Sequence, residues 1–423
     1  MKNCLHQRLY KHFCKYQILY EYQYGFRQNH STAQALLEIT DYLKSSIDNQ
    51  KYVSGIFLDL TKAFDTVDHS ILLKKLDNYG IRGKENRLLE SYLSDRCQYV
   101  SLGNIHSSKK TINCGVPQGS VLGPLLFLIY INDIAQCSPI GKIRIFADDT
   151  AAFIEGTIIE EVVSNSENLM NSLNLWFKAN KLTLSASKSC FVFFRSPRSK
   201  SITIPDILHF GESSINRAKS VKYLGITLEE NLNWNEHVHN VCNSLKKCFG
   251  TFYGIRDFIS IKHIKTIYYS LVYSTITYAL AVYGQTTKEN LLQIQRLQNK
   301  LLKVLTKKDS EFSTNKLHKE LKILKVEDIV DQEILSFVFN FRNQKLPKKF
   351  DNSFKMRNQN QQMRTRNIDN HMITPFTKTK YGEQTVRVKG SILWNQISPS
   401  LANTTNSKCF RRKWKESKIL NYT

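Results

Sequence analysis

The sequence lacks a long apolar run, a paired-cysteine motif and an even balance of charge. Its longest apolar run, from Val121 to Ile131, contains Gly123 and Pro124 and is shorter than the ~20 residues that cross a bilayer. The amino-terminal residues contain no apolar stretch of the kind found in a signal peptide. We therefore expect an intracellular protein that is not secreted and has no membrane partner.

The cysteines form no recognisable framework. Nine are present, but they are scattered, and no two form a C-x-x-C pair. His237, His239 and Cys242 are too isolated to be a zinc finger. An odd number of cysteines without a secretory segment favours reduced thiols. These features argue against a disulfide-stapled secreted domain and against a structural zinc module.

Acidic residues are outnumbered by basic ones. The chain has 36 Asp and Glu against 60 Lys and Arg, and its formal net charge is +24. A charge this large favours a polyanionic partner, usually nucleic acid. A solvated basic surface and a protein bound at a membrane surface are the alternatives. The length of 423 residues suggests two or three domains, and a hydrophobic content of 41% is sufficient for packed cores.

Apolar periodicity predicts a chain that begins with helices, continues with mixed helices and strands, and then becomes mainly helical. Residues 1–50 have a helical spacing, and residues 51–61 are expected to form a buried strand that ends at Asp59. We then expect helices near 68–80, 85–93, 119–134 and 159–180, hairpins at 98–113 and 142–154, and strands at 190–194 and 223–228. Helices are predicted over 235–310, most clearly at 261–283 and 291–305, and again over 394–420.

The last part of the chain is strongly basic. Residues 341–423 contain eighteen Lys and Arg against four Asp and Glu, and the Asn- and Gln-rich stretch at 357–362 is expected to be a loop or disordered. Basic residues are interleaved with Trp394, Phe410 and Trp414, which favours a nucleic-acid surface whose aromatic side chains stack or pack. A solvated helix with a packed tryptophan stripe explains the same pattern.

Two adjacent carboxylates, Asp148 and Asp149, lie between apolar segments that are expected to pair as strands. A surface turn is the simplest interpretation of this pair alone. Asp59 and the intervening segment 115–120 (GVPQGS) change that interpretation, because a metal-dependent polymerase palm requires these pieces in this order. A helix cap or a strand-end turn is the alternative for Asp59 taken alone.

Nucleotidyl transfer requires positioning and compensation of phosphate charge. Two Mg²⁺ ions about 4 Å apart activate the attacking 3′-oxygen and stabilise the leaving pyrophosphate, and such ions prefer carboxylates, waters and phosphates. Asp59 and Asp148 can hold them if their strands are neighbours. Asp149 points differently because strand side chains alternate, so its role is less defined. Asp65 is expected to cap the following helix rather than bind metal.

Four further residues are candidates for a nucleotide site. The ring of Phe64 can lie beneath the incoming sugar and exclude a 2′-hydroxyl, or it can simply pack in the core. Gln118 can contact the nucleotide or the template, and Gly119 allows close backbone approach before a helix amino terminus that favours phosphate. An ordinary Pro-Gly turn capped by Ser120 is the alternative. Lys188 can neutralise or protonate the leaving pyrophosphate, or it is a solvated lysine.

A turn at Tyr223, Leu224 and Gly225 completes the set of candidates. Its glycine would let a primer strand approach the backbone closely. The alternative is the plain start of a strand.

Together these segments resemble the reverse transcriptases of non-long-terminal-repeat (LINE-type) retrotransposons, most closely those of jockey-like elements. The resemblance covers the chain from about residue 8 to residue 310. The catalytic motifs of the family are matched by 57–65 (FLDLTKAFD), 115–124 (GVPQGSVLGP) and 146–149 (FADD). The later palm motifs are matched by 182–188 and 223–225, and the end of the fingers is matched by 23–27 (QYGFR). Residues 393–397 (LWNQI) match the C-terminal end of the family less specifically.

The resemblance implies an α+β right-hand polymerase fold with partial fingers, a palm with an antiparallel sheet, a helical thumb and a basic C-terminal region. We expect these parts at 1–50, 51–230, 231–310 and 311–423. The implied activity is RNA-directed DNA synthesis from dNTPs, with an RNA template, a DNA primer or target DNA and Mg²⁺ or Mn²⁺, in the nucleus and cytoplasm. The implied roles are catalytic metal binding for Asp59, Asp148 and Asp149, nucleotide binding for Phe64, Gln118, Gly119 and Lys188, and primer or template binding for Arg27, Tyr223, Leu224 and Gly225.

Departures from the family pattern affect the function we expect. The family normally has an Asn-Tyr-Arg-Pro-Ile-Ser-like stretch whose basic residues help to hold the nucleotide, and nothing like it precedes Leu9. No endonuclease domain and no zinc knuckle are found in the sequence either. We therefore expect an N-terminally truncated polypeptide, with a catalytically impaired remnant that only binds nucleic acid as the alternative. A different palm enzyme, such as a nucleotide cyclase, is disfavoured by segment 117–120 and the long helical thumb.

Overall fold

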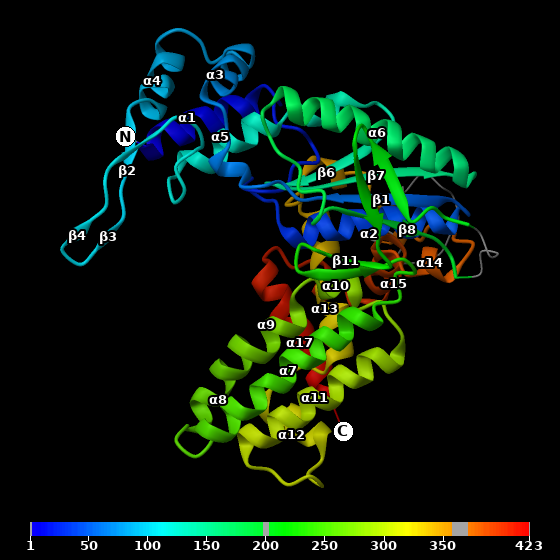
Figure 1. Cartoon of the computed structure of the whole chain (residues 1–423). Coiled ribbons are helices and arrows are strands. Elements are labelled where there is room, and N and C mark those ends of the chain that lie inside the picture. Colours follow the sequence, from blue (N-terminus) through cyan, green and yellow to red (C-terminus); the bar gives the residue numbers. More distant parts are fainter. Residues whose placement is uncertain (1, 198–202, 358–370, 423) are drawn as a thin grey trace. The chain divides into compact units, whose positions relative to one another are not determined.

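A computed structural model describes residues 2–197, 203–357 and 371–422 of the chain. The contacts divide it into two compact units. The first comprises Met1–Ala35 and Lys51–Val221, and the second comprises Leu36–Gln50 and Lys222–Thr423. Figure 1 shows the chain with many of its elements labelled. The four parts expected from the sequence remain a prediction, because the contacts define only these two units.

The first unit is built on a six-stranded sheet with the order β6-β7-β1-β8-β10-β9. Neighbouring strands are antiparallel except β8 and β10, which run parallel. The expectation of an antiparallel sheet is therefore correct apart from this pair. The strands are β1 (Tyr52–Leu58), β6 (Lys142–Phe146), β7 (Asp149–Gly156), β8 (Cys190–Phe194), β9 (Ile207–Phe210) and β10 (Ser213–Arg217).

The central strands of this sheet were predictable because they are buried as continuous apolar runs, as in β1 and β8. The edge pair β9 and β10 was not predicted. Both strands are short: β9 buries only Leu208 and Phe210, and the polar strand β10 buries only Ile215. β10 pairs with β8 and β9 pairs with β10, and this pairing, rather than local sequence, accounts for both strands.

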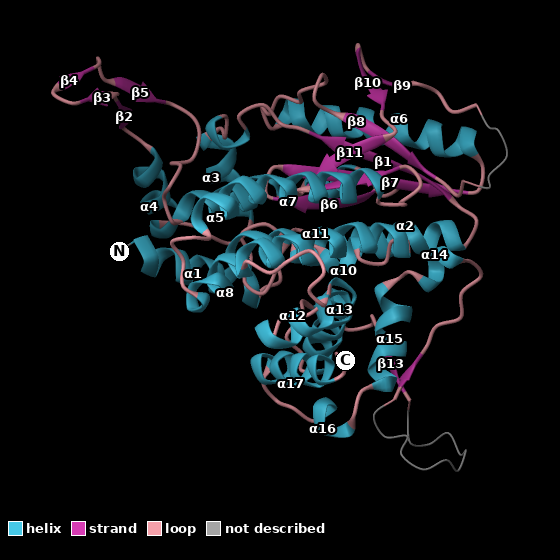
Figure 2. Ribbon diagram, turned by 90° about the horizontal axis from the view of Figure 1, so that it is seen from below, coloured by secondary structure: helices cyan, strands magenta, loops and turns pink. Residues whose placement is uncertain are grey.

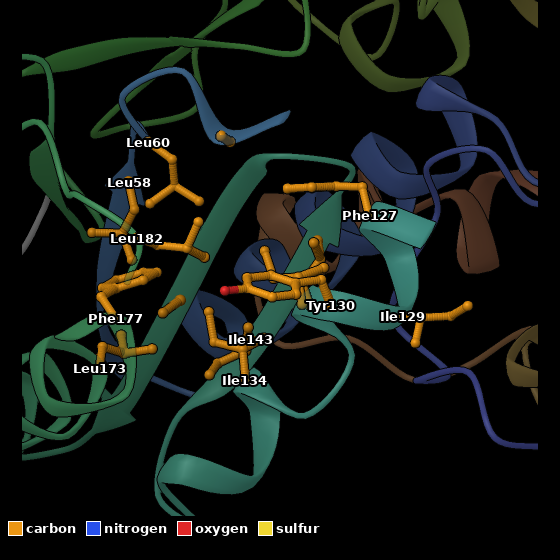
Figure 3. Packing of buried hydrophobic residues seen from close by; sticks show 14 of the residues in the cluster. Leu58, Leu60, Phe127, Ile129, Tyr130, Ile134, Ile143, Leu173, Phe177 and Leu182 are labelled. Carbon is orange, nitrogen blue, oxygen red and sulfur yellow. The ribbon is translucent and has the colours of Figure 1, made fainter. Parts of the chain in front are cut away.

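Helices complete the first unit, and Figure 3 shows part of its core. Leu58, Leu182 and Phe177 gather on one side, and the hydroxyl of Tyr130 points toward them and donates to the carbonyl of Asn180. The apolar helix α5 is buried along nearly its whole length, which explains why no polar face is seen in its sequence. The helices are α1 (Lys2–Lys15), α3 (His69–Asn78), α4 (Lys84–Leu93), α5 (Leu122–Ile131) and α6 (Ile159–Ala179).

An exposed hairpin follows α4, as the sequence predicted. It pairs β2 (Arg96–Gln98) with β5 (Lys110–Ile112) and, nearer its tip, β3 (Ser101–Leu102) with β4 (Ile105–His106). It extends away from α3 and α5 of the same unit (Figure 2).

The second unit is mainly helical. The strand expected at 223–228 is instead part of a hairpin of β11 (Ser220–Tyr223) and β12 (Ile226–Glu229). The expected helix at 261–283 is interrupted by a π-helical stretch, Tyr268–Tyr273, and by Ala279, whose φ is +54°. The helices are α7 (Asn235–Ile255), α8 (Ile261–Ile267), α9 (Ser274–Thr277), α10 (Leu280–Tyr283), α11 (Lys288–Thr306), α12 (Thr314–Leu321), α13 (Val326–Arg342), α14 (Lys380–Glu383), α15 (Val386–Gln396), α16 (Pro399–Ala402) and α17 (Ser407–Leu420).

Helix α2 (Thr32–Asp48) is bound to the C-terminal part of the second unit. The buried Asp41 carboxylate accepts from the backbone N–H of Val386 at 2.9 Å. The ammonium of Lys44 donates to the carbonyl of Gln384 at 2.8 Å. Burial lowers the pKa of Lys44 to about 8. Residues 384–386 of the basic C-terminal region are thus packed against α2. The Asn- and Gln-rich stretch lies, except for Arg357, outside the described residues.

No helix in the described part of the chain combines the length and the apolar character needed to cross a bilayer.

Candidate active site

The three predicted catalytic aspartates lie at one end of the six-stranded sheet. Leu58 in β1 is opposite Thr150 in β7, so the next step of the same register places Asp59 opposite Asp149. Phe146 in β6 is opposite Asp149, and the two-residue turn between them contains Asp148. The structure therefore brings together side chains that are about ninety residues apart in the sequence.

The charges of these carboxylates interact. Partial burial, followed by the negative charges of Asp148 and Asp59, raises the pKa of Asp149 to about 6. Asp149 is the most exposed of the three aspartates. The nearby like charges therefore raise its pKa in addition to the effect of partial burial. A divalent cation relieves such repulsion, and carboxylate oxygens are the ligands that Mg²⁺ and Mn²⁺ prefer.

The three carboxylates are ligands of the type that bind Mg²⁺ and Mn²⁺. Among the residues described, no three Asp, Glu, His or Cys side chains are already arranged around one point as a complete metal site. A polymerase metal needs only one or two carboxylates, because substrate phosphates and waters supply the other ligands. Asp59 and Asp148, with Asp149 beside them, can meet that requirement.

The chain after β1 is held by the segment that leads into β8. The N–H of Asp59 donates to the Ser189 hydroxyl at 3.1 Å, and its carbonyl accepts from the N–H of Ser185 at 2.9 Å. Lys188 lies in this same turn, and its side chain is exposed. Its place beside Ser189 is compatible with a role near the aspartates. Ser189 itself was not predicted, because a single serine gives no sequence signal.

Phe64 lies on a short 3₁₀ turn just after β1, and its ring is half-buried. It stacks on Phe127 of α5 with ring centroids 4.2 Å apart, and its edge approaches Phe26 at 6.1 Å. One part of the ring is therefore in the core, as the packing alternative predicted. The exposed remainder is what a sugar could contact.

The segment with Gln118 and Gly119 is fixed against this turn. Gly115 has φ of +87°, and a Cβ there would lie 2.7 Å from the carbonyl oxygen of Asp65. Gln118 donates to the Asp65 carboxylate at 2.9 Å, and Gly119 has φ of +76°. The Ser120 hydroxyl accepts from the N–H of Gly123 in the first turn of α5 at 2.9 Å, although Val121 is the residue at the helix cap.

The expectation that Asp65 caps the next helix is wrong. Asp68 caps α3, accepting from the N–H of Ile71 at 3.0 Å. Asp68 also pairs with Lys181 at 2.6 Å, which holds the pKa of its carboxyl well below the usual range. Both aspartates precede α3 in the sequence, and only the backbone conformation decides which of them caps it.

Arg27 is directed into the protein. Its guanidinium donates to the carbonyls of Tyr20 at 2.7 Å and Gln23 at 3.1 Å, and burial lowers its pKa. These contacts hold the loop around Gln23 and give no support to the predicted contact with nucleic acid.

The predicted primer-binding turn lies in the second unit. Leu224 and Gly225 have φ of +44° and +79°, and Tyr223 is buried. The hydroxyl of Tyr278 donates to the Leu224 carbonyl at 2.7 Å, and a Cβ on Gly225 would lie 3.0 Å from its ring. Tyr278, which the sequence did not single out, therefore supports this turn.

The predicted stacking aromatics of the C-terminal region are not available. Trp394, Phe410 and Trp414 are buried, and the first two stack with centroids 6.0 Å apart. Lys418 pairs with Asp328 at 3.3 Å. The packed tryptophan stripe is therefore the correct alternative.

A basic groove of about 490 Å³ lies where α7 and α11 end. Tyr253 on its wall is exposed. An ion pair of 2.8 Å links Lys307 to Asp257 nearby. Five cations line the groove: Arg256, Lys300, Lys303, Lys307 and Lys308.

The raised pKa of Asp149 leads to a pH prediction. Protons compete with metal when a ligand titrates, so Mn²⁺ affinity should fall as the pH is lowered through about 6 and level off above it. Titration of Mn²⁺ followed by electron paramagnetic resonance from about pH 5 to about pH 8 measures this dependence. Asp149→Asn should bind more weakly, with a flatter profile. Identical profiles for both proteins would contradict the prediction.

The sequence profile described as reverse transcriptase (RNA-dependent DNA polymerase) matches residues 1–228. The chain is 29% identical over 318 residues to the RNA-directed DNA polymerase from mobile element jockey of Drosophila melanogaster, covering 73% of this chain and 34% of that protein. It is 28% identical to the probable RNA-directed DNA polymerase from transposon X-element of the same species, covering 74% and 35%.

The chain thus spans about a third of the length of these relatives. Among solved structures, a telomerase from Candida albicans in complex with a telomeric RNA fragment matches with a TM-score of 0.45 and 13% identity, covering 76% of this chain and 58% of that one.

Proposed function

The chain belongs to the reverse transcriptase (RNA-dependent DNA polymerase) family, and from that membership we propose that it is the polymerase part of a retrotransposon protein that copies RNA into DNA. The observation that carries the proposal is the meeting of Asp59, Asp148 and Asp149 at one sheet end. The register of strands β1, β6 and β7 places these residues at that end. The family normally uses a divalent metal.

Asp59 and Asp148 would hold two Mg²⁺ or Mn²⁺ ions, which activate a primer 3′-oxygen and stabilise the leaving pyrophosphate. Asp149 adds negative charge beside them. Lys188, in the turn that binds the backbone of Asp59, neutralises charge on the pyrophosphate. The protein thereby contributes positioning and electrostatics rather than covalent chemistry.

The nucleotide would lie between the Phe64 turn and the segment with Gln118 and Gly119. Gly119 leaves space for close backbone approach, since a Cβ there would meet nothing within 4 Å. Phe64, braced by Phe127, would exclude a 2′-hydroxyl and select dNTPs. The partners we propose are an RNA template, a DNA primer or target DNA, and dNTPs, and the protein would act in the nucleus and cytoplasm.

The direct test is primer extension. The purified chain is incubated with a DNA primer annealed to an RNA template, labelled dNTPs and either Mg²⁺ or Mn²⁺, and extension products are measured. We expect incorporation that requires the metal. Nucleic-acid binding without incorporation under either metal would contradict the proposal and favour a remnant that only binds.

The basic groove at the ends of α7 and α11 leads to a further prediction. Lys300→Glu with Lys308→Glu should weaken RNA binding by about tenfold at ~0.1 M salt and reduce the slope of log affinity against log salt by about two, because two phosphate contacts are lost. Fluorescence anisotropy over a salt series measures both quantities. The matched control is Lys316→Glu with Lys319→Glu on α12, two exposed residues with the same change in net charge. Equal loss in both double variants would show that only net charge matters.

A further inference from the structure

A short segment before α2 is attached to the catalytic hairpin. Residues 22–25 run beside β6, an edge strand of the sheet. The N–H of Ile145 donates to the Tyr22 carbonyl at 3.0 Å, and the N–H of Tyr24 donates to the Ile145 carbonyl at 2.8 Å. These two bonds place Gln23 opposite Ile145, two residues before the turn that contains Asp148.

The side chain of Gln23 reaches that turn. It is 1% exposed, and its Oε1 accepts from the N–H of Gly25 at 2.8 Å and from the N–H of Ala147 at 3.1 Å. Ala147 has φ of +59°, a left-handed conformation that an alanine rarely adopts without support. Its buried N–H needs an acceptor, which Gln23 supplies.

Gly25 brings the two backbones into direct contact. A Cβ on Gly25 would lie 2.4 Å from the nitrogen of Ala147 and 3.0 Å from its Cα. Arg27 fixes the same loop from the other side through the Gln23 carbonyl. The turn is thus restrained both by a buried hydrogen bond and by steric contact.

We propose that Gln23 is a positioning residue for the catalytic site, because its side-chain oxygen holds the backbone of Ala147 and thereby directs the carboxylate of Asp148. The proposal rests on the metal-binding role proposed above for Asp148. A merely structural glutamine would stabilise the fold and leave the metal affinity of the folded protein unchanged.

The test is Mn²⁺ binding by the full chain, measured by electron paramagnetic resonance at constant pH. Gln23→Met keeps the length of the side chain and removes the acceptor. We expect affinity at the Asp148-dependent site to fall by about tenfold, in the range found for groups that orient metal ligands. Asp148→Asn identifies that site, and Gln28→Met, at an exposed position of the same loop, is the matched control and should bind like the wild type.

A second variant separates positioning from folding. Gly25→Ala disturbs the same contact from the other residue, so its effect and that of Gln23→Met should be less than additive in the double variant. Thermal melting shows that each protein is folded under the conditions of the titration. In primer extension, the positioning role predicts a lower kcat with little change in the KM for dNTP.

The outcomes distinguish this proposal from the proposed function. Folded Gln23→Met that binds Mn²⁺ as tightly as the wild type would overturn the positioning role. A wild-type chain without an Asp148-dependent Mn²⁺ site would overturn it too. If the wild type binds Mn²⁺ at that site and makes no DNA, the polymerase proposal fails, while a tenfold loss of affinity in Gln23→Met would still support the positioning role.

Discussion

Asp148→Asn should reduce the rate of metal-dependent DNA synthesis by about 10³-fold and leave RNA binding unchanged. Asparagine has the same shape as aspartate, so the turn between β6 and β7 should persist. The variant loses the negative charge and one anionic metal ligand. Because Asp148 is one cause of the raised pKa of Asp149, that pKa should move back toward its ordinary value. Single-turnover extension measures the rate, and carboxyl NMR measures the pKa.

The control for this experiment is Asp206→Asn, which changes an exposed aspartate of the same unit and should keep full activity. Retention of more than about a tenth of the wild-type rate by Asp148→Asn would show that this carboxylate is not essential. The assignment of the sheet end as the metal site would then be wrong.

Phe64→Val should reduce the preference for dNTPs over rNTPs by about 10²-fold. The wild-type ring is held by its stack on Phe127 and is only half-buried, so its exposed part is available to the proposed sugar site. Valine removes the ring and opens space for a 2′-hydroxyl. The ratio of kcat/KM for dCTP and CTP on one template measures the preference.

Loss of the stack should also lower the free energy of unfolding by about 1–2 kcal/mol, since the ring is only half-buried. Phe64→Tyr keeps the ring and should keep the selectivity, which separates the steric effect from loss of stability. An unchanged preference in folded Phe64→Val would leave Phe64 as a core residue without a role in sugar selection.

The sequence predicted the parts of the site that depend on local patterns. Apolar runs around Asp59, Asp148 and Asp149 indicated strands, and the strands are observed with bounds within a few residues of the prediction. The amphipathic helix predicted at 159–180 is α6. Such patterns are reliable because burial on one face or on both faces of an element is visible in its own residues.

Other features had no local signal. The helix cap was assigned to Asp65 instead of Asp68, because both precede the same helix and either could have capped it. The exposed face expected for Trp394 is buried by neighbours distant in sequence. The sequence indicated Gln23 only as part of the 23–27 motif. Its role as the acceptor for the N–H of Ala147 follows from the tertiary structure.

The amino-acid sequence alone was sufficient to predict the chemistry, because carboxylates at strand ends and glycines in tight turns indicate a metal and nucleotide site by their type and spacing. Only the tertiary structure decided which of those side chains lie close together. Register across β1, β6 and β7 brings Asp59 to Asp148 and Asp149, and a buried amide from residue 23 holds their turn. Contacts of this kind join residues separated by a hundred positions or so, and no window of local sequence contains both partners.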